Sequence, residues 1–214
     1  MDQARFHDRV RWGMNIAARR IGTPTDLYRP KGPLHPLAGP NRYLRMHAAF
    51  IPRQGSAYHT NSYGDPLWYG VFDAAYTKPG DYLCQDGRTL FIATQQSLVE
   101  PLCVQTNRCL TITRAIPPGD VGATAYGGLI RGSAFTLLGD WPASVLGVTG
   151  GGNPSAGLPT DTSISLWTVL MPAWPSVILQ TGDLIADDLG RSAVIVAAEL
   201  TELGWRLTVK QVTS

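Results

Sequence analysis

The strongest helical pattern in the chain lies at its start, in residues 3–21. Apolar side chains recur there at intervals of three and four residues, which places them along one side of an α-helix: Phe6, Val10, Met14, Ala17 and Ile21. Gly22 is a suitable C-terminal cap, and Pro24 prevents the helix from continuing. Because the stripe is narrow, we expect this basic amphipathic helix (residues 1–22) to lean on its own chain or on a neighbouring subunit.

The next segment, residues 23–56, is rich in proline and shows neither a helical nor a strand period. Proline at this density favours extended and poorly paired backbone. Large apolar residues such as Leu27, Tyr28 and Phe50 distinguish the segment from a disordered linker. We therefore expect an ordered extended arm that runs over the surface of its own domain or of another subunit.

An internal repeat follows, because residues 67–114 and 166–212 share short motifs in the same order. The matched motifs are Leu67-Trp68 with Leu166-Trp167, Gly80-Asp81 with Gly182-Asp183, Asp86-Gly87-Arg88 with Asp188-Leu189-Gly190-Arg191, Leu90–Ala93 with Ala193–Val196, and Cys109–Thr113 with Trp205–Val209. In each copy a Gly-Asp turn leads into a short strand, a tight hairpin turn and a second strand. One copy alone would be marginally stable, so the two copies are expected to share a core.

These patterns together predict a mainly β protein. We expect two related small β-barrel or sandwich modules, at residues 57–116 and 161–214, with an N-terminal α-helix and an extended arm. The intervening residues 117–160 form a Gly-rich insertion with strands expected at 134–138 and 144–148.

The tryptophans divide into two pairs. Trp68 and Trp167 occupy equivalent repeat positions, which favours a role in core packing. Trp141 and Trp174 adjoin prolines, and we expect them to be surface or interface anchors.

Composition supports the β prediction and narrows the function classes. The 23 glycines and 16 prolines argue against a helical bundle, and 44% hydrophobic residues with six tryptophans argue against a disordered chain. Residues 1–50 hold nine basic and three acidic residues, whereas the remainder holds nine basic and thirteen acidic ones. A basic arm on a mildly acidic body indicates an acidic partner surface, unless these arginines merely solvate one helix and one loop.

Motifs for catalysis or metal binding are missing from the sequence. There is no phosphate-binding loop and no Gly-x-Ser-x-Gly elbow, and the four histidines are widely scattered. Cys84, Cys103 and Cys109 form no Cys-x-x-Cys pair, and we expect buried free thiols in a reducing compartment. No apolar run is long enough to span a membrane. We therefore predict no enzymatic activity, no cofactor, no metal and no membrane insertion.

The modules Gly80–Gln96 and Gly182–Val212 resemble small β-rich modules of tailed-bacteriophage head-closure and tail-connector proteins. In that family a Gly-Asp turn, a Gly-Arg hairpin and a closing strand like Trp-Arg-Leu-Thr-Val recur. The opening RWGMNIAARRIGTPTDLYRP is similar to the start of phage virion proteins encoded near capsid genes. The resemblance implies a subunit that forms a sixfold or twelvefold ring and is built into the virion in the cytoplasm of a host bacterium.

The function expected from this resemblance is a non-enzymatic structural protein at the head–tail interface or short tail, as a connector, nozzle or fibre attachment. Expected partners are further copies of the chain and portal, adaptor, tail or fibre proteins, with passive contact with packaged DNA. Nine residues of the helix and the arm are predicted to anchor these interfaces: Phe6, Val10, Trp12, Met14, Arg19, Arg20, Leu27, Tyr28 and Arg29.

Two alternatives stay open. The first is a carbohydrate-binding or carbohydrate-acting β protein, which would need tryptophans and acids such as Glu199 and Glu202 to converge in one cleft. The second is a nucleic-acid-binding module that uses the basic N-terminal arm.

Overall fold

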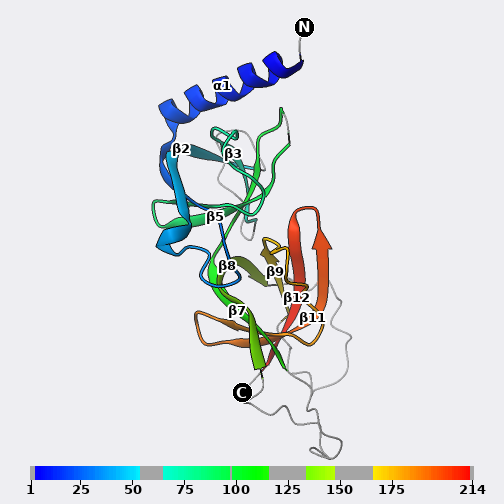
Figure 1. Ribbon diagram of the computed structural model, residues 1–214. Coiled ribbons are helices and arrows are strands. Elements are labelled where there is room, and N and C mark those ends of the chain that lie inside the picture. The colour runs from blue at the N-terminus through cyan, green and yellow to red at the C-terminus, as the bar shows by residue number, and fades with distance from the viewer. Residues whose placement is uncertain (1–2, 54–64, 97, 116–133, 148–165, 213–214) are drawn as a thin grey trace, which may run out of the picture.

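The computed structural model describes residues 3–53, 65–96, 98–115, 134–147 and 166–212. In Figure 1 the N-terminal helix and two β-barrels follow one another in a row. The helix lies across the end of the first barrel that faces away from the second barrel.

The described residues form one α-helix, one short 3-10 helix and twelve strands. The helix α1 spans Gln3–Ile21 and ends directly before Gly22, as its pattern predicts. The first barrel consists of β1 (Thr23–Tyr28), β2 (Arg42–Pro52), β3 (Leu67–Val71), β4 (Tyr82–Gln85), β5 (Arg88–Thr94) and β6 (Leu102–Gln105), with the 3-10 helix η1 (Gly39–Asn41) before β2. The second consists of β7 (Arg108–Ala115), β8 (Ala134–Gly147), β9 (Leu166–Met171), β10 (Leu184–Asp187), β11 (Ser192–Thr201) and β12 (Gly204–Val212).

The two barrels share one strand order. The first runs β1-β2-β3-β6-β5-β4, and β4 pairs back onto β1. The second runs β7-β8-β9-β12-β11-β10, and β10 pairs back onto β7. Each strand of the first barrel thus has a counterpart six strands later, which confirms a mainly β fold with two related modules and an N-terminal helix.

The boundaries of the modules differ from those expected. β1 and β2 lie in the range assigned to the arm, yet they pair with each other and complete the first barrel. β8 lies in the range assigned to the insertion, although it is one continuous strand of the second barrel. Four of the six prolines in residues 23–56 fall in the connection between β1 and β2, so the flanking residues are free to pair.

One motif match is also wrong. Cys109–Thr113 was matched with Trp205–Val209, which lies in β12. The counterpart of β12 is β6, whereas Cys109–Thr113 lies in β7, the first strand of the second barrel and the counterpart of β1.

The connection of residues 29–41, here called the strap, contains turns and the 3-10 helix η1 and lies on the second barrel. The carbonyl of Pro33 accepts hydrogen bonds from the Gly139 amide (3.0 Å) and from Nε1 of Trp141 (2.6 Å). The His35 amide donates to the Gly139 carbonyl at 2.9 Å. The strap therefore joins the first barrel to β8 of its own chain.

A core shared by both barrels joins them more extensively. Tyr82 and Phe91 lie on the outer surface of the first barrel and are fully buried with residues of the second. The Tyr82 ring meets those of Phe91 and Trp141 edge to face, each at 6.2 Å between centroids. Its hydroxyl donates to the Pro142 carbonyl at 2.9 Å, and burial raises the pKa of Tyr82.

Trp141 and Trp174, expected at the surface or at an interface, belong to this shared core. Trp141 is fully buried, and the half-buried Trp174 packs on it at 6.0 Å between ring centroids. Of the two expected positions, surface or interface, the structure shows an interface, namely the one between the two barrels of the chain.

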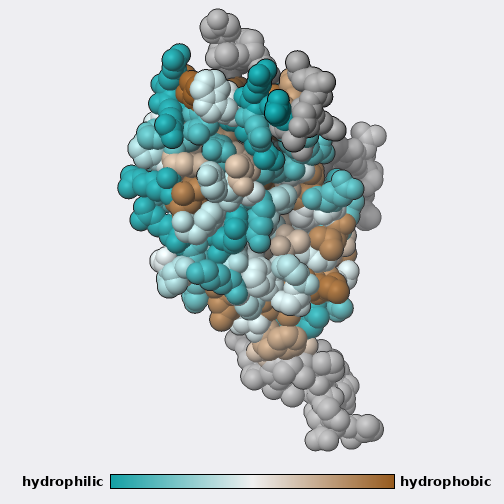
Figure 2. Space-filling view, turned by 45° about the horizontal axis from the view of Figure 1, so that its top comes forward, coloured by the Kyte–Doolittle hydropathy of each residue, from teal (hydrophilic) through white to brown (hydrophobic). Residues whose placement is uncertain are grey.

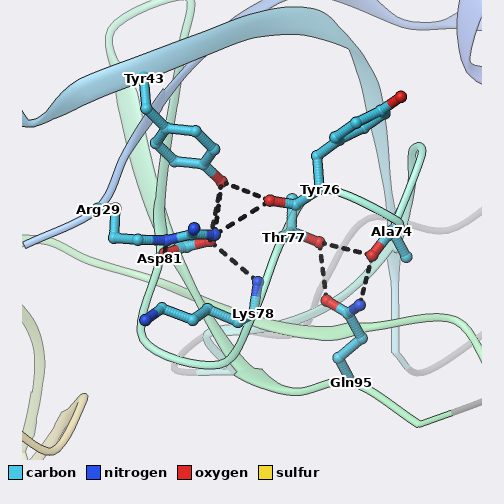
Figure 3. Close-up of polar contacts among 8 residues, drawn as sticks. All are labelled: Arg29, Tyr43, Ala74, Tyr76, Thr77, Lys78, Asp81 and Gln95. Carbon is cyan, nitrogen blue, oxygen red and sulfur yellow. Dashed lines mark hydrogen bonds and ion pairs between the residues drawn. The ribbon is translucent and has the colours of Figure 1, made fainter.

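Each barrel also carries the same ion pair beside its closing seam. In the first barrel Nε and Nη2 of Arg29 donate to the two carboxylate oxygens of Asp81, at 2.8 and 2.7 Å (Figure 3). In the second, Nε and Nη2 of Arg114 donate to Asp183 at 2.7 and 2.8 Å. Both carboxylates are almost completely buried. Such bidentate, charge-assisted pairs are geometrically specific.

The Asp81 carboxylate also holds its own turn. It accepts hydrogen bonds from the Lys78 amide at 2.9 Å and from the Tyr43 hydroxyl at 2.8 Å (Figure 3). Burial, with the hydrogen bond to Asp81, raises the pKa of Tyr43. Gly80 has a φ of +89°, a conformation that favours glycine, and Gly182 has a φ of +95° in the matching turn.

The matched tryptophans are equivalent in space as well. The guanidinium of Arg88 lies over the Trp68 ring at 5.7 Å, and that of Arg191 lies over the Trp167 ring at 4.5 Å. The same repeat positions thus form the same cation–π pair in both barrels.

The cysteines differ from the expectation of buried thiols at one position. Cys103 is buried and Cys84 is half-buried, but Cys109 is exposed. Burial raises the pKa of Cys103 and Cys84. Cys109 lies on β7, which was not recognised as part of the second barrel.

We predict that Asp81→Asn lowers the free energy of unfolding by about 3 kcal/mol, because it removes the charge that pairs with Arg29 in a buried site. The matched control is Glu199→Gln, which removes the exposed ion pair with Arg206 and should cost less than about 1 kcal/mol. Urea unfolding measures both values. Equal losses in the two variants would contradict a special role for the buried carboxylate.

Candidate protein-binding surface

The helix α1 is fixed on the end of the first barrel by close backbone contact. Its residue Ala18 is buried, and the Gly22 amide donates to the Ala18 carbonyl at 2.8 Å. A Cβ at Gly22 would lie 2.5 Å from the Ala18 carbonyl oxygen and 2.6 Å from that of Ala48 on β2. Glycine is therefore required where the helix turns into β1.

Two of the predicted anchors face the first barrel. Val10 and Met14 are half-buried and line a shallow groove with Phe72, Leu98 and Val99. These two side chains thus contact their own chain, as the narrow apolar stripe suggested.

The other predicted anchors on α1 are exposed, although Arg19 also lines a groove with Arg45 and Met46 of β2. Trp12 lies on the opposite side of the helix from Val10 and Met14, and 68% of its surface is exposed. Phe6 is 46% exposed, and Arg19 and Arg20 are exposed in the last turn. In Figure 2, which turns the helix end of the molecule forward, this region is mostly hydrophilic with isolated hydrophobic residues.

The arginines of α1 differ from those of the barrels in their partners. Most barrel arginines pair with a carboxylate: Arg29, Arg42, Arg45, Arg108, Arg114, Arg191 and Arg206. Within the described part of the chain, no arginine of α1 forms such a pair; these are Arg5, Arg9, Arg11, Arg19 and Arg20. We define the docking surface as Phe6 and Trp12 with Arg5, Arg9 and Arg20, because Arg11 and Arg19 line grooves against the first barrel.

The three predicted anchors of the arm do not belong to this surface. Leu27 is completely buried inside the first barrel, so its prediction as an interface anchor is wrong. Tyr28 is half-buried against the shared core. Arg29 is engaged within the chain by Asp81 and by the Tyr76 carbonyl at 3.0 Å (Figure 3). Leu27 and Tyr28 lie on β1, a strand that the sequence interpretation did not include, and Arg29 directly follows it.

Polar groups of the described residues are engaged mainly in structural contacts. Glu199 on β11 forms an ion pair with Arg206, and no described group of three or more His, Cys, Asp or Glu side chains could hold a metal ion. The helices in this part of the chain include none long and apolar enough to cross a membrane.

Comparison with known proteins adds no relatives. The chain matches no family model, no curated protein and no solved structure.

We predict that Gly22→Ala displaces α1 from its seat, because the added methyl group would overlap two carbonyl oxygens. Overpacking of this kind costs about 1–3 kcal/mol in the free energy of unfolding. Proteolytic cleavage within α1 should become faster, as measured by timed digestion and mass spectrometry.

Gly13→Ala is the control for this variant. Gly13 is exposed in the middle of α1, with open space around its Cβ position. Alanine there should stabilise the helix by up to about 1 kcal/mol. Equal cleavage rates for Gly22→Ala and the wild type would contradict close packing between the end of α1 and the first barrel.

Proposed function

We propose that this protein is a non-enzymatic structural subunit of a tailed-bacteriophage virion. In this proposal it forms a ring at the head–tail interface or in the short tail, as a connector, nozzle or fibre attachment. Its neighbours are further copies of the chain and other virion proteins.

The observation that carries this proposal is the docking surface on α1. Tryptophan and arginine are the residue types most enriched at the energetic centres of protein interfaces. Here Trp12 is largely exposed, and the arginines around it lack ion-pair partners within the described residues. A surface of this kind is typical of a protein that binds an acidic protein surface.

Two further observations support a structural role. The barrels are joined by a common core and by the strap, so the body offers a stiff support for the docking surface. The module motifs resemble those of head-closure and tail-connector proteins, and the Gly-Asp turns of that resemblance hold the buried ion pairs.

Nucleic-acid binding is a second candidate function, favoured by the exposed arginines of α1. Arginines on one helix can contact several phosphates of DNA. Exposed apolar side chains such as Phe6 and Trp12 are not needed for phosphate contact, so a protein partner fits the surface better.

We expect the protein to be present in purified virions, at a copy number that is a multiple of six. Trp12→Ala should lower its incorporation at least tenfold, as expected when a central interface tryptophan is lost. Quantitative mass spectrometry of purified particles measures this. Ile178→Ala, which removes an equally exposed side chain elsewhere, should have no effect. Absence of the protein from virions would refute the proposal.

For the second candidate, the purified protein should bind duplex DNA at low salt and release it steeply as salt rises. Arg9→Glu combined with Arg20→Glu should abolish this binding, whereas Arg206→Glu should not. Fluorescence anisotropy with a labelled duplex gives the affinity at each salt concentration. No binding by the wild type at low salt would exclude this candidate.

A further inference from the structure

The outer face of the first barrel that packs on the second barrel has an equivalent face on the second barrel, because the two barrels share one strand order. In the first barrel the outward side chains of β4, β5 and β6 are buried against the second barrel; these are Tyr82, Phe91, Ala93 and Val104. The strands β10, β11 and β12 are their counterparts in the second barrel.

Hydrogen bonds align the two faces residue by residue. Ile92 exchanges backbone hydrogen bonds with the Gly80-Asp81 turn, and Ile195 exchanges the same bonds with Gly182-Asp183. The alignment therefore places Leu184 at the position of Tyr82, Val194 at that of Phe91, and Val196 at that of Ala93.

A β-bulge confirms the last of these equivalences. The pairing of β5 with β6 shifts register between Ile92 and Thr94, which leaves Ala93 as the extra residue. The pairing of β11 with β12 shifts between Ile195 and Ala197, which leaves Val196. The same irregularity thus occurs at the same position of both barrels.

The two faces differ in what covers them. Ala93 is only 3% exposed, whereas Val196 is 40% exposed. Cross-strand pairing of Val194 with Lys210, of Lys210 with Leu166 and of Ser192 with Val212 adds two more exposed apolar side chains on the same side. We call this surface the free face. It comprises Leu166, Leu184, Val194, Val196 and Val212, with Lys210 among them at the position that Val104 has in the first barrel.

We propose that the free face binds the α1 end of a second copy of this chain, so that copies associate head to tail. This inference rests on the proposed function as an assembly subunit and names the partner of its docking surface. The contact would repeat between copies the stacking that joins the two barrels within one chain.

The internal correspondence indicates which end of the second copy is bound. Within the chain, the outward side chains of the first barrel share a core with Trp141 of β8 and Met171 of β9. Their counterparts in the first barrel are β2 and β3, the two strands on which α1 lies. If a second copy is stacked in the same way as the two barrels, the free face of one copy therefore contacts α1 of the other, with its exposed Trp12.

Charge favours the same orientation. Residues 1–107 carry a net charge of +4, and residues 108–214 carry −2. The arginines of α1 are exposed at the end of the molecule that faces away from the second barrel (Figure 1). Opposite net charge on the two halves of the chain favours contact between the first half of one copy and the second half of the next.

An interface between two different surfaces is heterologous. It closes into a ring when the rotation between successive copies closes, and otherwise it continues as a filament. The proposed contact therefore supplies the kind of association that a ring-forming subunit needs.

The test compares the full-length wild type with Trp12→Asp and Val196→Lys by sedimentation velocity over a range of concentrations. The wild type should form oligomers, and each variant should weaken association at least tenfold. Both changed side chains are exposed, so circular dichroism and urea unfolding should match the wild type. Ile178→Lys, at a position that is 68% exposed and lies off the free face, is the control and should assemble normally.

Mixing the two variants gives the decisive result. A Trp12→Asp copy keeps an intact free face, and a Val196→Lys copy keeps an intact α1. The mixture should therefore form heterodimers, while each variant alone stays monomeric, because each mixed pair retains one complete contact.

The outcomes separate this inference from the proposed function. Normal assembly of Val196→Lys, or a mixture that stays monomeric, would overturn the free face as the partner of α1 and leave the virion role standing. A wild type that stays monomeric up to its solubility limit would overturn the inference too, and virion composition would still decide the proposed function.

Discussion

Closure of each barrel depends on a carboxylate that cannot remain charged in a protein interior without a partner. Asp81 and Asp183 lie just before β4 and β10, and their arginines lie at the ends of β1 and β7, the strands with which β4 and β10 pair. Desolvation of an ionised carboxylate is costly, so the chain is held in the one arrangement that brings the guanidinium to it. The ion pair therefore specifies which strands meet at the seam.

The size of the barrels explains why they are stacked. A six-stranded barrel with short strands encloses few side chains, and small cores are marginally stable. Here the outward aromatic side chains of one barrel complete the core of the other, with Tyr82 between Phe91 and Trp141. The two barrels consequently stabilise each other, and neither outer surface at this junction is available to a partner.

Local signals in the sequence were sufficient to predict the Gly-Asp turns, the N-terminal helix and the duplication of the β module. The Gly-Asp turns were recognisable because glycine is needed at positive φ and the following aspartate holds its turn. β1 and β2 were missed because the prolines around them indicated an extended arm and the positions of β2 do not alternate cleanly. β8 was expected only as two separate strands, because Gly139 and Pro142 interrupt its pattern. Burial of Leu27 and Trp141 follows from the pairing of these strands and could not be read from neighbouring residues.

The candidate surface was partly predictable for the same reason. Trp12 and the arginines of α1 stand out from helical periodicity alone, since their exposure depends only on which side of the helix meets the barrel. The free face was not predictable, because its significance comes from comparing Val196 with Ala93, two positions with the same backbone and different surroundings.

The tight junction at Gly22 has a consequence for the rate and affinity of binding. Gly22 directly follows α1 and lies so close to the Ala48 carbonyl that a Cβ would not fit, so the helix has little freedom to pivot on the barrel. A partner then meets Trp12 on an element that is already ordered, and complex formation loses little conformational entropy. Preorganisation of this kind lets a modest contact area support lasting association.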